Sequence, residues 1–515
     1  MEAGPYDFYR VKLSNSLREK SSAVRLDFNS ASSNGYRDNT GYGQQKLTLR
    51  VDSNRQEWIN SSVISGSLLN QETGAYVEGE NAYSDPSLKR SNPSPEAYRD
   101  AWSSRIHTRF TKKSKHSELT LTPYWRRSQM NFLMHFLPGT PAESNEQTSA
   151  GLQANFSWNV SKHTFFSGLR MEGAEIELQQ NQVSPEVFGK LPQGKQYDFD
   201  VDTRYFSTYI GADWLIGDKI HLLNSVRFES LYYDYENNML SGNTREDGSQ
   251  CNSVDGCRYT RPASSNDTFS DGAVRLGFSY DFNDRSQFFA SIGSGFRAPQ
   301  ATDLYRLQAG QENADIDSEK ISSFELGLNR YGHRYHSQIT AYSQKKKNVI
   351  YRNSDRYVFN DGATKSEGIE LALNIELNID QQLSFAGSYA RHQYENTWGY
   401  EVATGDDMDT APRKLAQISW LYQPSFLLNG KTSWVLDASH TSRYFMEPTN
   451  TVFYPGHTLF NARVSYALSS VIELSSRMIN ISNKVYAERA DYAFGSERYF
   501  PGAPRSLFFA FEWQF

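Results

Sequence analysis

The C-terminal segment alternates between apolar and polar side chains, and no other part of the chain restricts the fold as much. From Arg505 to Phe515 one face is apolar and the other small or polar, with Phe508 as the exception. The apolar positions are Leu507, Phe509, Phe511, Trp513 and Phe515, and the opposite ones are Ser506, Ala510, Glu512 and Gln514. A period of two indicates a β-strand. An aromatic strand that ends the chain is typical of the closing strand of a membrane barrel; the last strand of a soluble sandwich is the alternative.

The composition favours strands over helical cores. Only 38% of the 515 residues are hydrophobic, yet 14% are aromatic, with 32 Tyr, 31 Phe and 9 Trp. The mean hydropathy is −0.67, and no apolar run reaches the length of about 18 residues that a transmembrane helix needs. Barrel strands need only about 9–11 residues, half of them facing water. Since no low-complexity linker interrupts residues 1–515, we expect one domain.

Short turns alternate with long polar stretches along the whole chain. The ten turns lie near Arg18–Lys20, Asn54–Arg55, Lys113–Lys115, Ser161–Lys162, Gly217–Asp218, Asn283–Asp284, Tyr331–Gly332, Asn378–Asp380, Asn429–Gly430 and Ser469–Ser470. The long stretches are Ala31–Tyr42, Leu68–Ala97, Met130–Glu146, Gln180–Asp200, Glu236–Ser265, Ala298–Asp317, Asn353–Gly362, Thr397–Ala411, Met446–Gly456 and Ala487–Gly502, and a very short one at Gly4–Pro5 makes eleven. Together they predict an all-β antiparallel barrel of 22 strands, with short periplasmic turns and long extracellular loops. Its first strand is a truncated stump at Met1–Ala3.

Individual segments support this count. In Lys46–Ser53, Leu47, Leu49 and Val51 alternate with polar and charged residues. A charge at the lipid midplane costs about 2–4 kcal/mol. The charged face must therefore point into a wet interior.

Four segments resemble the TonB-dependent receptors, the 22-stranded outer-membrane transporters of Gram-negative bacteria. They are Gly293–Pro299 (GSGFRAP), Ser366–Leu371, Asn480–Tyr486 and Tyr499–Arg505. The resemblance implies uptake of a scarce nutrient, by default a ferric siderophore, without a cofactor. It also implies a Gram-negative outer-membrane location, contact with outer-membrane lipid and lipopolysaccharide, and assembly by the barrel-assembly machinery through Phe511, Trp513 and Phe515.

The front of the chain departs from the family pattern. Family barrels follow a plug domain and a short box that pairs with TonB, and we find neither in residues 1–515. Met1–Tyr6 has no basic region followed by an apolar run, so we expect no signal peptide. Partnership with the TonB complex is expected only if a plug and a box lie upstream. A passive porin-like channel is therefore the alternative function.

Other function classes receive no support. A net charge of −6 offers no basic face for nucleic acid. We find no glycine-rich phosphate loop and no nucleophile elbow, so we do not expect an enzyme.

Aromatic and basic residues near the predicted loops are candidates for ligand binding. They are Tyr232, Tyr233, Tyr235, Arg297, Tyr305, Arg306, Trp398, Tyr400, Tyr444 and Phe445. Exposed rings at a barrel mouth stack on flat ligands, but rings also form girdles at the lipid headgroups. The stretch from Phe296 to Pro299 is either the root of a loop or a ligand contact.

Cysteine, lysine, aspartate and histidine clusters complete the candidates. Cys251 and Cys257 predict a small disulfide loop in an oxidising compartment, with two free thiols as the alternative. Lys345–Lys347 suit an anionic chelate, lipid phosphates or simple solvation. Asp406, Asp407 and Asp409 suit a hard cation or a soluble loop. His333 and His336 lack further ligands nearby, so no metal site is predicted.

Overall fold

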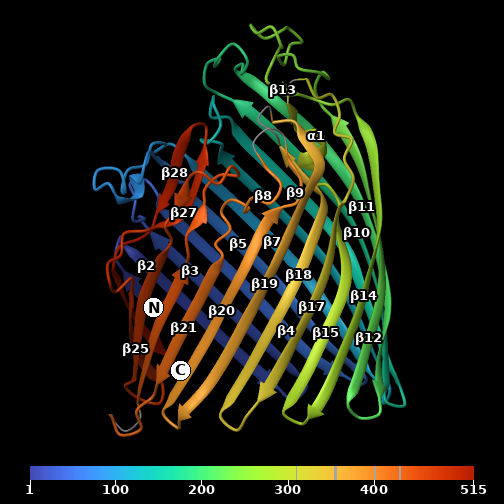
Figure 1. The fold of residues 1–515 in the computed structure, drawn as a ribbon, viewed down its shortest axis with the longest axis vertical. Helices are drawn as coiled ribbons and strands as arrows, with labels where there is room; N and C mark the ends of the chain where they lie inside the picture. Colours follow the sequence, from blue (N-terminus) through green and yellow to red (C-terminus); the bar gives the residue numbers. More distant parts are fainter. Residues whose placement is uncertain (309, 353–355, 399–401, 428–430) are drawn as a thin grey trace.

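The chain folds into a closed antiparallel barrel of 22 strands, seen in a computed structural model that describes residues 1–515 except 309, 353–355, 399–401 and 428–430. Each wall strand pairs with its neighbours in chain order, and β1 (Glu2–Gly4) pairs with both β2 (Phe8–Glu19) and β29 (Ser506–Trp513). The strands run obliquely around the wall (Figure 1). The predicted fold class is confirmed.

The remaining wall strands are β3 (Ser22–Ser33), β4 (Tyr42–Arg55), β5 (Trp58–Glu72), β7 (Tyr98–Lys113), β8 (Ser117–Leu133), β9 (Ala142–Val160), β10 (His163–Gln182), β11 (Gly194–Ile216), β12 (Ile220–Asn237), β14 (Ser265–Asn283), β15 (Ser286–Arg297), β17 (Glu319–Tyr331), β18 (Tyr335–Arg352), β19 (Val358–Asn378), β20 (Gln381–Tyr394), β21 (Lys414–Tyr422), β22 (Thr432–Thr441), β25 (His457–Ala467) and β26 (Ile472–Ile479). The short elements of the loops are β6 (Val77–Glu78), η1 (Ala82–Ser84), β13 (Tyr259–Thr260), α1 (Ala301–Tyr305), β16 (Leu307–Gln308), β23 (Tyr444–Phe445), β24 (Phe453–Tyr454), β27 (Ala487–Ala493) and β28 (Ser496–Pro501).

Ten connections gather at one end of the barrel, which we call the turn end, and eleven at the other, the loop end. Both numbers agree with the sequence prediction. The predicted turn at Asn429–Gly430 lies outside the described residues. Since short turns join neighbouring strands directly, each pair of strands is a simple hairpin.

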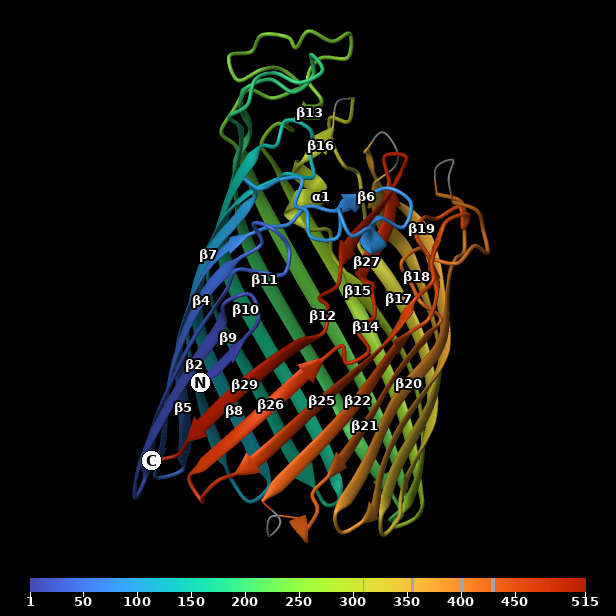
Figure 2. The same cartoon turned by 90° about the vertical axis from the view of Figure 1, so that its left-hand side faces the viewer.

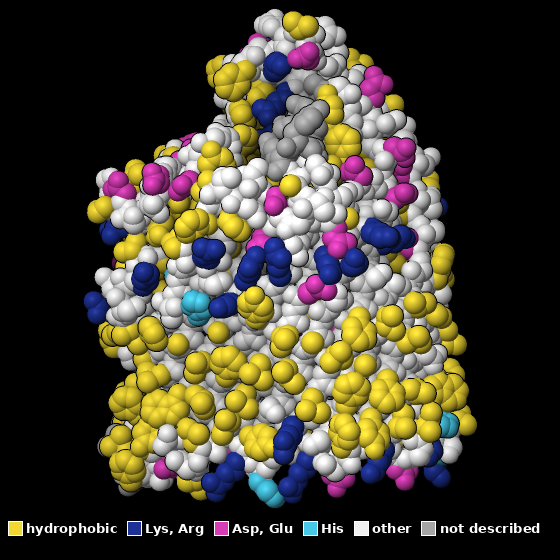
Figure 3. Space-filling view, viewed as in Figure 1, with side chains coloured by type: hydrophobic (Ala, Val, Ile, Leu, Met, Phe, Trp, Pro, Cys, Tyr) yellow, Lys and Arg dark blue, Asp and Glu magenta, His cyan; other side chains and the backbone are white. Residues whose placement is uncertain are grey.

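The outer face carries an apolar band. In Figure 3 the yellow side chains concentrate in the half of the wall nearer the turn end, and Lys and Arg gather above this band and below it. Leu276, Ile292 and Phe324 are exposed there by 56%, 57% and 46%. Isolated in water, such a band would be unstable, so it faces lipid. None of the helices among the described residues is long and apolar enough to cross a membrane.

The closing strand follows the predicted alternation. Leu507, Phe509, Phe511 and Trp513 are exposed on the outer face. Phe508, the exception in the pattern, points inward, where its ring meets Phe8 edge to face at 5.4 Å and lies under the guanidinium of Arg477 at 4.6 Å.

Several strands rise further toward the loop end than the sequence suggested. The segments 130–146 and 180–200 were expected to be loops, but only 134–141 and 183–193 connect strands. Strands β10 and β11 contain 20 and 23 residues, about twice the length needed to span a membrane. The expectation was wrong because polar residues also pair well in strands that stand in water.

The seam between the two ends of the chain is held by few pairs. β1 pairs with β2 at Glu2, Ala3 and Gly4 and with β29 at Glu2 and Ala3. Figure 2 shows the N-terminus partway up the wall and the C-terminus near the turn end. Beside the seam, a cavity of about 620 Å³ is lined by the edges of β2 and β29. A first strand of stump length is what the sequence predicted.

Candidate functional site

A small sheet covers part of the loop end. β6, from the loop after β5, pairs with β28, and β28 pairs with β27. Val77, Ala490 and Tyr499 are buried at its centre, together with Met446 and Tyr454 from a neighbouring loop. We call this assembly the cap sheet. It joins segments more than 400 residues apart and fixes their position over the lumen (Figure 2).

A second packed cluster lies under α1 at the loop end. Gln300 and Asp303 cap this helix, since the Gln300 amide donates to the Asp303 carboxylate at 3.1 Å. Tyr305 at its end stacks on Tyr235 with ring centroids 4.0 Å apart, and Tyr233 donates to the Pro299 carbonyl.

These three tyrosines are therefore not exposed at the mouth. Tyr233, Tyr235 and Tyr305 have relative exposures of 7%, 1% and 2%. The expectation of exposed rings was wrong for them, because α1 folds back onto β11 and β12 and buries them. Their contact with a ligand stays a prediction, which would require this packing to open.

A large cavity lies between the cap sheet and the inner wall, and we call it the mouth cavity. It has a volume of about 590 Å³, within the range of about 300–1,000 Å³ usual for ligand pockets. Tyr42, Gln71, Arg99 and Phe132 form one row across β4, β5, β7 and β8. This row points inward, because Leu68, three positions before Gln71, is exposed on the outer face.

Aromatic and basic side chains line the mouth cavity. They are Tyr36, Tyr42, Tyr76, Tyr98, Phe132, Phe136 and Phe500, with Arg37, Arg99, Arg489 and His135, and Glu488 is the one acidic residue among the described lining. Rings provide large apolar contacts at low entropic cost, and guanidinium groups bind carboxylates and stack on aromatic planes. The mouth cavity is therefore suited to a planar or anionic ligand.

The inner wall below the mouth cavity is basic. A second cavity of about 670 Å³ lies against β7, β8 and β10. Its charged lining consists of Arg105, Arg109, Lys113, Arg126 and Arg170, with Glu118. Positive charge along a lumen raises the local concentration of anions.

A barrel of 22 strands with this loop end is shared with a known family. The family model described as "TonB dependent receptor-like, beta-barrel" matches residues 3–483. The chain belongs to the TonB-dependent receptors. It is accordingly an outer-membrane protein of a family of receptors and transporters, and the resemblance noted in the sequence is confirmed.

Individual relatives of the receptor barrel are distant. The vitamin B12 transporter BtuB of Photobacterium profundum is 21% identical over 244 residues, which cover 46% of this chain and 38% of that transporter. BtuB of Vibrio vulnificus is 23% identical over 248 residues, or 47% of this chain and 37% of that one. The matched segments thus span less than half the length of either relative.

Solved structures confirm the fold of the receptor barrel. The ferric yersiniabactin uptake receptor FyuA from Yersinia pestis superposes with a TM-score of 0.81 at 14% identity, covering 100% of this chain and 79% of that one. The unliganded ferric citrate transporter FecA superposes with a TM-score of 0.81 at 14% identity, covering 100% of this chain and 77% of that one. The copper transporter OprC superposes with a TM-score of 0.78 at 13% identity, covering 100% of this chain and 79% of that one. Similar barrels therefore carry different cargoes.

The other predicted aromatic residues of the receptor barrel lie in three places. Tyr232 is half-buried and donates to Asn266 at 2.8 Å. Trp398 stacks on Tyr351, with ring centroids 4.9 Å apart, while Tyr400 lies outside the described residues. Tyr444 and Phe445 form β23 beside the cap sheet, where the Tyr444 hydroxyl accepts from the Ala490 amide. The structure does not bring these residues into one site.

The two predicted arginines have acidic partners. Arg297 forms an ion pair with Glu319 at 2.8 Å. Arg306 pairs with Glu143 at 2.9 Å and lies over the Tyr197 ring, with its guanidinium carbon 5.8 Å from the centroid.

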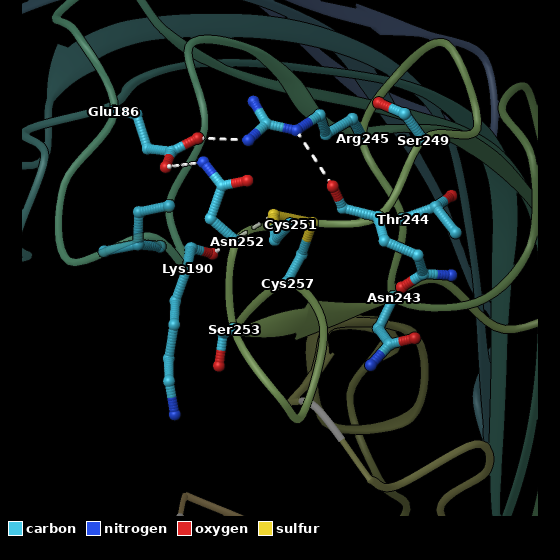
Figure 4. Close-up of a disulfide and its surroundings, with 12 residues drawn as sticks. Glu186, Lys190, Asn243, Thr244, Arg245, Ser249, Cys251, Asn252, Ser253 and Cys257 are labelled. Atoms are coloured by element: carbon cyan, nitrogen blue, oxygen red, sulfur yellow. Dashed lines mark hydrogen bonds and ion pairs between the residues drawn. A yellow bond between two sulfur atoms is a disulfide. The ribbon is translucent and has the colours of Figure 1, made fainter.

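Cys251 and Cys257 form a disulfide, with an S–S distance of 2.09 Å. Figure 4 shows how the loop around it is attached to the loop between β10 and β11. Arg245 and Asn252 both bind the Glu186 carboxylate, and Lys190 pairs with Asp255 at 3.1 Å. The disulfide therefore stabilises a contact between two loops.

The remaining charged candidates have ordinary protein partners or are solvated, and Asp409 accepts a hydrogen bond from Tyr394. Lys345 pairs with Glu395, whereas Asp407 accepts from Arg391 and Arg413. His336 stacks on Tyr331 with centroids 4.2 Å apart. Within the described part of the chain, no group of three or more His, Cys, Asp or Glu side chains is arranged to hold a metal ion.

Sequence reasoning did not identify the mouth cavity. Its residues come from six separate stretches of the chain, and each stretch contributes only one to three rings or basic side chains. A correct prediction of the pairing of β4, β5, β7 and β8 would have brought three of these residues together, because this pairing aligns Tyr42, Arg99 and Phe132.

Proposed function

We propose that this barrel is the outer-membrane part of an uptake receptor for a scarce nutrient, with a ferric siderophore as its cargo. The observation that carries the proposal is the mouth cavity, an aromatic and basic space of about 590 Å³ under the cap sheet. The names of FyuA and FecA, which share the fold, identify ferric chelates as their cargoes. If a plug and a TonB box lie upstream of this barrel, the TonB complex would supply the energy.

The outer surface supports two further contacts. Lys and Arg side chains gather above the apolar band (Figure 3), and their charge would suit the phosphates of outer-leaflet lipid and lipopolysaccharide. Phe511, Trp513 and Phe515 are exposed by 41%, 59% and 84%, which suits recognition by the barrel-assembly machinery.

Binding of iron-loaded chelates to cells tests the proposal. The chain is expressed in the outer membrane of a Gram-negative host lacking its own siderophore receptors, and retention of radioactive ferric catecholate, hydroxamate and citrate is measured. We expect saturable retention of one chelate, weakened about tenfold by Phe132→Ala with Phe500→Ala, since buried aromatic contacts dominate such sites. Phe324→Ala on the lipid face is the matched control and should leave retention unchanged.

Planar-bilayer recordings distinguish the porin-like alternative. A large steady conductance that no chelate alters, together with no saturable retention on cells, would favour a passive channel. Ligand-dependent changes in conductance would favour the receptor.

A further inference from the structure

A second, smaller cavity lies at the loop end, where five segments of the chain meet. Its volume is about 50 Å³, and Arg258, Arg306, Arg356, Tyr197 and Tyr259 are among its lining residues. We call it the arginine cavity. The three arginines come from the loops that follow β12, β15 and β18. Such a space holds a group of a few atoms and not a whole chelate.

The positive charge around the arginine cavity is only partly compensated. Arg306 pairs with Glu143 at 2.9 Å. Among the described residues, no carboxylate lies within the 4.0 Å of an ion pair from the guanidinium groups of Arg258 and Arg356. Arg352 lies beside them and donates to the carbonyls of Thr302 and Arg306, at 3.1 and 3.2 Å, which leaves its charge in place.

The environment of Arg356 disfavours its positive charge. Burial, followed by the charges of Arg258 and Arg352, lowers the pKa of this guanidinium. Like charges that are partly removed from water destabilise a fold unless an opposite charge approaches them. A bound anion would relieve this repulsion.

A tyrosine hydroxyl in the same lining lacks an acceptor. Tyr259 is 3% exposed, and its hydroxyl donates no hydrogen bond to any residue that the structure describes. Its neighbour Arg261, with a guanidinium carbon 5.3 Å from the ring centroid, can only donate to this oxygen. A buried hydroxyl that donates no hydrogen bond destabilises the fold. It is therefore available to donate to a ligand that enters the cavity.

The disulfide fixes one wall of the site. Arg258 follows Cys257 directly, and its backbone amide donates to the Lys190 carbonyl at 2.9 Å. Because the bond to Cys251 constrains this stretch, Arg258 is held toward the cavity before any ligand arrives.

We propose that the arginine cavity binds a carboxylate or a similar small oxyanion of the imported ligand, so that the receptor selects anionic chelates. The site offers guanidinium donors that match a carboxylate in shape, plus one free hydroxyl donor. The inference rests on the proposed function only in identifying the oxyanion as part of the cargo.

Calorimetric titration of the folded barrel in detergent tests the site directly, with iron-free acetate and citrate as probes. We expect binding that weakens with salt and that Arg356→Gln reduces about tenfold, while Arg356→Lys retains most of it. Tyr259→Phe should weaken binding several-fold. Arg334→Gln makes the same substitution on an exposed residue of the turn between β17 and β18 and should have no effect.

The outcomes separate the two proposals. Binding of neither probe by the wild type, or equal losses in Arg356→Gln and Arg334→Gln, would overturn the anion site. If Arg356→Gln fails to fold, Arg258→Gln and Tyr259→Phe decide in its place. Preference of the wild type for the cationic chelate ferrioxamine B over ferric citrate would overturn anion selection while leaving siderophore uptake intact. Anion binding without saturable retention of any chelate on cells would overturn the proposed function alone.

Discussion

At the scale of single residues, the loop end contains both well-paired and poorly paired polar groups. Asp407 is 7% exposed and binds two arginines, Arg391 of β20 at 2.8 Å and Arg413, which directly precedes β21, at 2.5 Å. His135, beside the mouth cavity, has a buried Nδ1 atom without a hydrogen-bond partner among the described residues. Each of these two side chains can be tested by a single substitution.

Removing the charge of Asp407 should loosen the loop between β20 and β21. Asp407→Asn keeps the shape but leaves two arginines without a counter-charge, and we expect a loss of about 1–3 kcal/mol in the free energy of local opening. Hydrogen exchange of residues 402–413 measures it. Asp406→Asn is the control, and an equal change in both variants would contradict the role of the ion pairs.

Acid should loosen the loop that contains His135. Burial lowers the pKa of this imidazole below 6.5. The folded state therefore binds fewer protons than the unfolded one, so stability is complete above about pH 6.5 and decreases as the pH falls below it. Exchange of residues 134–141, corrected for intrinsic rates, should show this loss at about pH 5.5. His135→Phe should remove the pH dependence; if it persists, another group is responsible.

At the scale of strands, position in the alternation decides which side chains are tolerated. Leu326 of β17 is exposed on the outer face, and Ser323 faces the lumen. Leu326→Arg should lower the free energy of unfolding in lipid vesicles by about 2–4 kcal/mol, whereas Ser323→Arg should have little effect. Denaturant unfolding measures both variants, and equal losses would show that the faces are wrongly assigned.

The seam depends on a glycine in β1. A Cβ atom on Gly4 would lie 2.3 Å from the Phe508 ring, so only glycine allows this ring to pack against the strand. Gly4→Val should displace Phe508 and weaken the pairing of β1 with β29. A cysteine pair at Ala3 and Phe509, which are partners in register, should cross-link less efficiently in this variant. Unchanged cross-linking would contradict the role of Gly4.

At the scale of the whole molecule, the cap sheet connects the first third of the chain to its last loop. Glu78 and Arg498 are partners in register between β6 and β28. Cysteines at these two positions should therefore form a disulfide under mild oxidation, detected by a shift in gel mobility. The pair Glu78→Cys with Glu497→Cys is the control, because residue 497 points to the opposite face. A failure of the first pair would show that the cap is not formed in the membrane.

The sequence was sufficient to predict the barrel, because the patterns that indicate a barrel lie between residues close together in the chain. The alternation of Leu507 to Phe515 and the recurring turns reflect neighbours in the chain, and both persisted in the structure. The upper ends of β10 and β11 were missed, since a polar strand in water has the composition of a loop. The burial of Tyr235 under α1 and the meeting of Arg258, Arg306 and Arg356 depend on contacts between distant segments, which no local pattern records.

The short β1 also has a mechanical consequence. It is held by three register pairs to β2 and two to β29, whereas β2 and β3 share eleven. Under a force applied to the two termini, the ring should rupture first at this seam and then unzip hairpin by hairpin. The cap sheet bridges the loop after β5 and the loop before β29, and would resist after the seam has yielded. The seam is therefore the weakest junction in the barrel wall. A plot of force against extension should begin with one small peak.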